Sequence, residues 1–463
     1  MPGLPSGRAG ALYERPTGVR SCRPRWTRPV KGEEPQRLRR ELGVGGATMM
    51  GLGSMVGTGV FVSIGIAAGA AGPATILAIM LAALVATCNA LSSAQLAAAH
   101  AVSGGTYEYG YRYLTPAFGF TAGWMFLCAK TASAATAALG FGGYLLRLVG
   151  NGEAAMPWLA LGAVVLFTLL VLIGLKRSSV MNIAIVSVTL TALGAFVVLG
   201  LPTAVKGSGN FSPFFPKTDG PALHGFLYAT ALMFVAYTGY GRIATLGEEV
   251  KEPRKSIPRA IIVTLGVTAV LYILVSVAAI GIVGADRFAG SVAERATPLE
   301  TVARALGTPL LPQLIAVGAI TAMLGVLLNL IIGLSRVVLA MGRQGDASPL
   351  FARLSGDGRA PTAAVILVGV TVGALALIGS VETTWAFSAF TVLIYYAITN
   401  LAALRLPPED RLYPRWVAIA GLIACLFLAF WVPPRIWLAG LALIGVGLIW
   451  HGLATRLRAK KEA

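Results

Sequence analysis

The chain has 463 residues, of which 56% are hydrophobic and only 12% are charged. Soluble domains carry about 25% charged residues, so this composition excludes an ordinary soluble protein. The net charge of +18 would suit nucleic-acid binding, but most Lys and Arg residues fall in the tails and in loops on the side of the N-terminus. This asymmetry places that side in the cytoplasm, and no nucleic-acid partner is expected.

Residues 1–41 differ in kind from the rest of the chain. They contain ten Lys or Arg and six Pro residues, without an apolar run. Such a segment buries too little apolar surface to fold, so we expect a disordered basic cytoplasmic tail. It also lacks the apolar core of a signal peptide. The four cysteines are scattered, and we predict neither a metal site nor a cofactor.

Apolar runs of about 20 residues, the length that spans about 30 Å of hydrocarbon as a helix, recur along the remaining sequence. They predict an all-α polytopic membrane protein with a twelve-helix domain over 42–456 and a cytoplasmic tail, 457–463. Twelve crossings place both termini in the cytoplasm, and the plasma (inner) membrane is the expected location. The predicted helices are 43–71, 73–99, 117–149, 157–175, 180–202, 221–247, 258–284, 309–341, 361–379, 383–405, 414–432 and 434–456.

The first predicted helix carries the most informative motif, Gly53-Ser-Met-Val-Gly-Thr-Gly59. Glycine costs roughly 1 kcal/mol relative to alanine in a helix interior, so three glycines weaken a continuous helix. In lipid, backbone leaves the helix only where it is buried in protein or lines a cavity. The motif therefore predicts either a broken helix at a transport site or close packing through the G-x-x-x-G pair of Gly53 and Gly57.

The sixth predicted helix has a similar weak point, where Gly239 and Gly241 follow Tyr237 and Thr238. Helices 1 and 6 each open a set of five, and an odd number of crossings inserts the second set upside down. Broken helices at matching positions of two halves indicate a transport site. We predict a 5+5 inverted repeat with helices 1 and 6 broken: repeat one is about 43–202, repeat two about 221–405, and two appended helices cover about 414–456.

The two breaks also predict which chemical groups a substrate meets. N–H groups at the start of a second half-helix suit a carboxylate, and C=O groups at the end of a first half-helix suit an ammonium group. An α-amino acid carries both groups. Glycine, which has no Cβ, lets the ligand approach the backbone closely. The predicted substrate-binding residues are Met55, Val56, Gly57, Thr58, Gly59, Phe234, Val235, Tyr237, Thr238 and Gly239.

Four segments, in matching order and spacing, resemble amino acid permeases of the amino acid–polyamine–organocation (APC) superfamily. Residues 51–61 are similar to the first-helix signature of these permeases, 102–107 to the loop after helix 2, 234–259 to helix 6 and its following loop, and 335–345 to the end of helix 8. The likeness covers about 42–456. It is nearest to the bacterial cationic amino acid transporter-like branch.

The resemblance implies the inverted-repeat fold and alternating access, in which a bundle rocks against a scaffold. It also implies that the backbone near 55–59 and 234–239 holds the main-chain groups of an amino acid. Two departures concern ion coupling. Proton-coupled members of that branch place a lysine in helix 5, and the corresponding stretch, 182–190, has none. Their third helix tends to carry a carboxylate near the position of Lys130 in this chain.

Lys130 lies near the middle of the third predicted helix, where a lysine costs roughly 2.5–3.5 kcal/mol on insertion scales. It should therefore face a cavity or a partner. One hypothesis is that it replaces the missing helix 5 lysine, donates to carbonyls of helix 1 and changes charge during proton coupling. The alternative is a cation permanently bonded to helix-end carbonyls. Because no carboxylate is predicted at mid-depth, a cationic side chain favours neutral substrates, or loosely held cationic ones.

The sequence thus predicts a secondary active transporter that imports neutral or cationic amino acids with protons. An amino acid exchanger and a non-transporting amino acid sensor on the same scaffold remain alternatives, and the oligomeric state stays open. A dinucleotide-binding enzyme is excluded because the glycines between Gly51 and Gly59 are spaced G-x-G-x-x-x-G within a helix, without the strand and acid of that fingerprint. No nucleophile–base pair supports a hydrolase, so the protein is not expected to be an enzyme.

Overall fold

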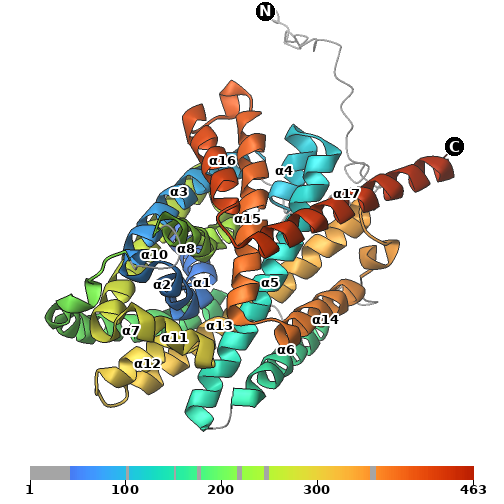
Figure 1. The fold of residues 1–463 in the computed structure, drawn as a ribbon. Helices are drawn as coiled ribbons and strands as arrows, with labels where there is room; N and C mark the ends of the chain where they lie inside the picture. The colour runs from blue at the N-terminus through green and yellow to red at the C-terminus, as the bar shows by residue number, and fades with distance from the viewer. Residues whose placement is uncertain are drawn as a thin grey trace, which may run out of the picture. The chain divides into compact units, whose positions relative to one another are not determined.

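The computed structural model describes residues 42–100, 104–150, 153–174, 179–215, 222–244, 250–354 and 361–462. These residues are almost entirely helical, with one isolated bridge between Leu42 and Val250 (Figure 1). The predicted tail, 1–41, lies outside the described residues.

The helices follow the predicted ranges closely. The first part of the chain forms α1 (Val44–Met55), the π-helical turn η2 (Gly59–Ser63), α2 (Ile64–Ala71), α3 (Thr75–Ala99), α4 (Thr106–Tyr113), α5 (Pro116–Val149), α6 (Met156–Leu172) and α7 (Ser179–Lys206). The second part forms α8 (Ala222–Tyr237), the 3₁₀ turn η6 (Thr238–Tyr240), α9 (Gly241–Ala244), α10 (Pro253–Val283), α11 (Ala285–Arg295), α12 (Pro298–Ala305), α13 (Leu311–Gln344), α14 (Thr362–Ile378), α15 (Val381–Leu404), α16 (Arg415–Ala429) and α17 (Pro434–Glu462).

Among the described residues, eight helical segments are long and apolar enough to cross a membrane. One of them, Val44–Ala99, covers two of the predicted helices. Three shorter apolar helices, α6, α14 and α16, coincide with three further predicted ranges. The chain is therefore an all-α polytopic membrane protein, as the composition predicted.

The two glycine-interrupted segments lie in the core of the helix bundle. Every residue from 55 to 68 is buried, and so is every residue from 229 to 238. A helix that is buried on all sides belongs to the protein interior rather than to the lipid boundary. Outer helices differ, since α6, α16 and α17 expose large apolar side chains such as Leu166, Ile423 and Trp450. These exposed apolar faces suit contact with lipid.

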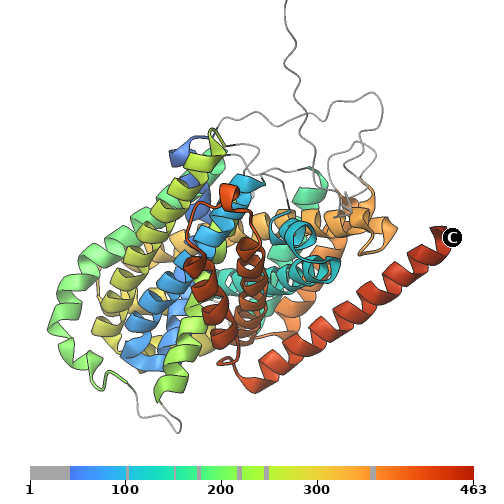
Figure 2. The same ribbon diagram turned by 90° about the horizontal axis from the view of Figure 1, so that it is seen from above.

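Helices that are distant in the sequence pack side by side around this core. α5 packs against α13 and α15, α3 packs against α8 and α10, and α6 lies along α14 (Figure 1). α1 contacts both α7 and α10. The last helix, α17, runs along the edge of the bundle, where it contacts α5 and α15 (Figure 2).

A buried carboxylate, Asp346, joins α4, the end of α13 and α17. Its Oδ2 accepts hydrogen bonds from Tyr107 at 2.7 Å and from Tyr111 at 2.5 Å, and its Oδ1 lies 3.2 Å from Nδ1 of His451. Beside this cluster, burial raises the pKa of the Glu108 carboxyl, while a hydrogen bond with Gln344 acts in the opposite direction. The network supplies the partners that a buried carboxylate requires.

A second buried carboxylate, Glu300 of α12, joins that helix to the far end of α5. Its side chain is 1% exposed and forms ion pairs with Arg147 of α5, at 3.2 Å, and with Arg304 of its own helix. Arg147 also donates to the hydroxyls of Thr297 and Thr301, both at 3.4 Å. The short helices α11 and α12 were not predicted because their charged residues interrupt the apolar pattern.

Candidate functional site

The first break separates α1 from η2 and consists of residues 56–58. Val56 has φ −83° and ψ 83°, and the N–H of Gly57 donates to the carbonyl of Met55 at 3.0 Å. This three-residue turn is an inverse γ-turn, which ends the α-helix. The carbonyl of Gly57 then accepts from Val60 and Phe61, both at 3.1 Å, and the helix resumes.

The second break is a change of helix type rather than a gap. α8 ends at Tyr237, and the 3₁₀ turn Thr238–Tyr240 connects it to α9. The two breaks meet through glycines. A Cβ on Gly239 would lie 2.6 Å from both the carbonyl carbon and the carbonyl oxygen of Ser54, and a Cβ on Gly59 would lie 2.8 Å from Cβ of Ala236. Only glycine leaves room for this approach.

Tyr272 of α10 connects both breaks through its hydroxyl group. Its Oη lies 2.7 Å from the carbonyl oxygen of Met55 and 3.3 Å from that of Ala236. The ring is fully buried, and its centroid lies 5.3 Å from that of Tyr237. Because a hydroxyl carries one hydrogen, Tyr272 donates mainly to the nearer Met55 carbonyl.

Replacing Tyr272 with phenylalanine is expected to lower the free energy of unfolding by about 1–2 kcal/mol, since a buried hydrogen bond is lost without any change of shape. Amino acid uptake should fall as well, because the two breaks are no longer tied together. Melting temperature in detergent and uptake would both be measured, with the partly exposed Tyr413 changed to phenylalanine as the control. Equal melting temperatures for the two variants would contradict this role.

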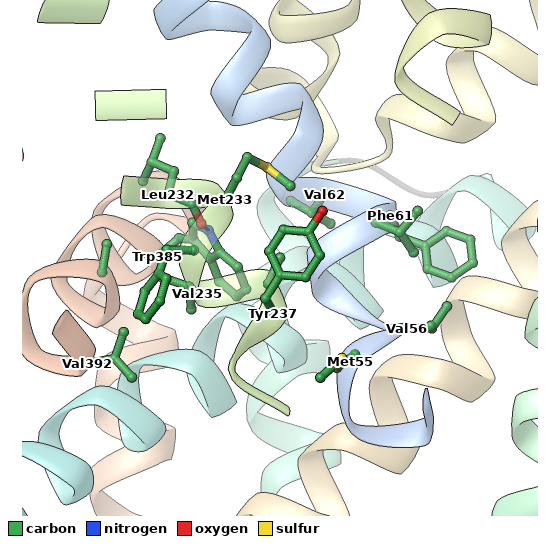
Figure 3. Close-up of a cluster of buried hydrophobic side chains, with 14 of the residues drawn as sticks. Met55, Val56, Phe61, Val62, Leu232, Met233, Val235, Tyr237, Trp385 and Val392 are labelled. Atoms are coloured by element: carbon green, nitrogen blue, oxygen red, sulfur yellow. Dashed lines mark hydrogen bonds between the residues drawn. The ribbon is translucent and has the colours of Figure 1, made fainter. Parts of the chain in front are cut away.

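A cavity of about 50 Å³ lies between the breaks. Its walls come from α1, η2 and α8, together with α5, α13 and α15. The lining residues are Ser54, Met55, Thr58, Gly59, Lys130, Ser133, Val235, Ala236, Thr238, Gly239, Val326, Leu330 and Trp385. The indole N–H of Trp385 donates to the carbonyl of Leu232 at 3.0 Å, which fixes this wall (Figure 3).

Lys130 is half-buried and reaches from α5 to the second break. Its Nζ donates to the hydroxyl of Thr238 at 2.8 Å, and that hydroxyl donates to the carbonyl of Val235 at 2.7 Å. The acceptor of Lys130 therefore lies on the second broken helix, whereas the coupling hypothesis places its acceptors among carbonyls of the first. Thr58 also lines the cavity, and its hydroxyl is buried without a hydrogen-bond partner in the described part of the chain.

Six of the ten predicted binding residues line the cavity: Met55, Thr58, Gly59, Val235, Thr238 and Gly239. The other four lie close by and point elsewhere. Val56 and Gly57 form the turn of the first break, and Phe234 meets the ring of Tyr396 edge-on at 5.7 Å. Tyr237 directs its hydroxyl to the carbonyl of Ile79 at 3.4 Å.

Figure 3 shows the close packing around this site, with Met55, Val56 and Phe61 on the first broken helix and Val235 and Tyr237 on the second. Sequence reasoning did not select the walls from α13 and α15, which contribute Val326, Leu330 and Trp385. In helices that are apolar on most sides, the pattern does not tell which residues face a cavity. Two of the predicted binding residues have carbonyls that already accept a hydrogen bond: Met55 accepts from Tyr272, and Val235 accepts from Thr238.

Residues 46–456 match the amino acid permease family. The chain belongs to this family. The match confirms the resemblance to permeases of the APC superfamily, and relatives named as cationic amino acid transporters also match the chain. The family and these relatives are transporters rather than enzymes.

Three relatives show the range of this permease family. An uncharacterized transporter of Mycobacterium tuberculosis is 41% identical over 90% of this chain and 92% of its own length. The methylthioribose transporter of Bacillus subtilis is 28% identical over 90% of this chain and 94% of its own length. The branched-chain amino acid permease BcaP of Bacillus subtilis is 27% identical over 91% of this chain and 94% of its own length. Amino acid transport across a membrane is thus the activity that the family supports.

Proposed function

We propose that this permease imports amino acids by alternating access, with the substrate held in the cavity between the two helix breaks. The observation that carries this proposal is the meeting of the breaks at Gly59 and Gly239, where backbone and cavity adjoin. The N–H groups near Thr58 and Gly59 suit the substrate carboxylate. The carbonyls that end α1 and α8 suit its ammonium group, which would compete with Tyr272 and Thr238 for them.

The predicted inverted repeat is supported by a reciprocal pattern of helix contacts. If the five helices of repeat one correspond in order to the five of repeat two, α1 corresponds to α8 and α3 corresponds to α10. The contact of α1 with α10 then has its counterpart in the contact of α8 with α3. In the same way α5 corresponds to α13 and α7 corresponds to α15. The contact of α5 with α15 therefore has its counterpart in the contact of α13 with α7. Such a two-fold relation allows one bundle to rock against the other around a fixed site. We propose twelve crossings, with both termini in the cytoplasm and the protein in the plasma membrane.

Of the two substrate classes expected from the sequence, neutral amino acids suit the cavity better than cationic ones. Lys130 is the ionisable side chain among the lining residues, and no lining residue carries a carboxylate. A cationic substrate side chain in this space would meet a like charge at low dielectric, which is unfavourable.

The proposed transport is tested by uptake of an equal mixture of the twenty amino acids into proteoliposomes, read by mass, with and without an inward proton gradient. An inward gradient of about one pH unit supplies about 1.4 kcal/mol per proton and drives up to about tenfold accumulation. We expect accumulation that requires the gradient. Uptake that occurs only in exchange for amino acid inside the proteoliposomes would indicate an exchanger instead. The absence of any uptake would favour a sensor and contradict the proposal.

Lys130 is the proposed coupling group. Changing Lys130 to alanine is expected to remove the stimulation of neutral amino acid uptake by the proton gradient, while exchange of labelled for unlabelled substrate continues. The exposed Lys206, at the end of α7, provides the matched lysine-to-alanine control, which should retain full stimulation. Unchanged stimulation in the Lys130 variant would disprove the coupling role.

A further inference from the structure

The ammonium group of Lys130 has one hydrogen bond, to Thr238, among the described residues. An ammonium carries three donor hydrogens, so two of them have no protein acceptor there. No ion pair joins Lys130 to a carboxylate in the described part of the chain, although other buried charges, such as Glu300, are paired. A charge at membrane depth requires an anionic or strongly polar partner.

The helices that line the cavity do not supply this partner. α1, α5, α8 and α13 contain neither Asp nor Glu, and α15 contains a single carboxylate, Glu382. The register of α5 on α15 is fixed by two hydroxyl pairs at 2.8 Å, Ser133 with Ser388 and Thr136 with Thr384. Glu382 therefore lies beyond Thr136, at least about 9 Å along α5 from Lys130 at 1.5 Å per residue.

Three polar lining residues of the cavity, Lys130, Ser133 and Thr238, come from α5 and the second break. Lys130 and Ser133 are three residues apart on α5 and so share one face of the helix. Thr238 directly precedes Gly239, which places the Lys130 ammonium beside the second break. The lining residues from α13 and α15 are apolar: Val326, Leu330 and Trp385. A substrate whose main-chain groups occupy the breaks thus has one charged partner available for its side chain.

We propose that this site selects amino acids with a short acidic side chain, whose second carboxylate pairs with Lys130. The inference rests on the proposed function and extends its charge argument: the site that disfavours cationic side chains over neutral ones favours acidic side chains over both. Aspartate carries the shortest such side chain. Binding of an acidic substrate would also favour the charged form of Lys130, so that substrate and proton enter the site together, as reciprocal linkage requires.

The test compares uptake of aspartate with that of its neutral isostere asparagine in proteoliposomes containing the full chain. A charge-assisted hydrogen bond contributes about 1.5–3 kcal/mol, so aspartate should exceed asparagine by about 10- to 100-fold in apparent affinity. In the variant Lys130→Met, aspartate uptake should be lost, while asparagine should still be taken up, without stimulation by the proton gradient. Lys206→Met, changed at an exposed position, should keep the wild-type ratio.

The wild-type comparison does not depend on any variant, so the proposal stays testable if Lys130→Met folds poorly. Asparagine transported as well as or better than aspartate would overturn the acidic-substrate inference and leave amino acid transport intact. An equal loss of both substrates in a monodisperse Lys130→Met protein would also overturn it, because Lys130 would then act on the shared α-carboxylate. Absence of uptake of any amino acid would overturn the proposed function and this inference with it.

Discussion

Replacing Gly239 with alanine is expected to abolish amino acid uptake in a protein that still inserts into the membrane. The added Cβ would lie 2.6 Å from the main chain of Ser54 and 2.7 Å from Cγ of Met55. Backbone atoms cannot rotate away as a flexible side chain can, so the two broken helices must move apart. Overpacking of this kind costs about 1–3 kcal/mol, and a cost of about 1.4 kcal/mol at the site already corresponds to a tenfold loss.

Gly266 of α10 offers the matched control for this variant. It is exposed, and a Cβ built on it meets no atom within 4 Å. Gly266→Ala should therefore transport normally and should be slightly more stable, because alanine is the better helix former. Uptake by the two variants at equal reconstituted amounts is the comparison to make. Normal uptake by Gly239→Ala would show that the close approach of the breaks is unnecessary.

Replacing Arg147 with methionine is expected to lower the free energy of unfolding by about 3 kcal/mol, at the lower end of the range for breaking a buried ion pair. The carboxylate of Glu300 is 1% exposed and would keep only the pair with Arg304. Loss of Arg147 also removes its bonds to Thr297 and Thr301. The readout is the melting temperature of the purified protein in detergent.

A second variant separates the lost charge pair from lost packing. The double change of Arg147 to methionine and Glu300 to leucine removes the uncompensated charge, and buried ion pairs replaced by apolar residues often cost nothing. It should therefore recover much of the melting temperature. The exposed Arg287 of α11, changed to methionine, should have no effect. A stable Arg147→Met single variant would mean that α12 is held to α5 by its apolar contacts.

Helix positions could be predicted from the sequence because apolar runs in a membrane protein are long and end in charged or turn residues. The predicted helix 383–405, for example, is α15, Val381–Leu404. The positions of the breaks could also be predicted from the sequence, because glycines at 53–59 and 239–241 weaken a helix regardless of how it packs. The short helices α11 and α12 were missed because their charges conceal short buried faces, Phe288 and Val292 in α11 and Leu299 and Val302 in α12.

The walls of the site could not be predicted, for a physical reason. A helix such as α13 is apolar on most sides, so periodicity does not distinguish a cavity-facing Val326 from a valine that packs against a neighbouring helix. Phe234 and Tyr237 adjoin the second break in sequence, yet the helical turn directs them toward Tyr396 and Tyr272. Lys130 was recognisable because a lysine in an apolar run requires a special environment. Its bond to Thr238 depends on tertiary packing.

The central claim is that the cavity between the two breaks holds an amino acid. The most direct test is retention of ligand by the purified protein: wild type and the Gly239→Ala variant are equilibrated with an equal mixture of the twenty amino acids, separated from free ligand and read by mass. We predict that wild type retains a defined subset of amino acids. The Gly239→Ala variant, shown by its melting curve to be folded, should retain none. Failure of wild type to retain any amino acid, or equal retention by both proteins, would contradict the placement of the site.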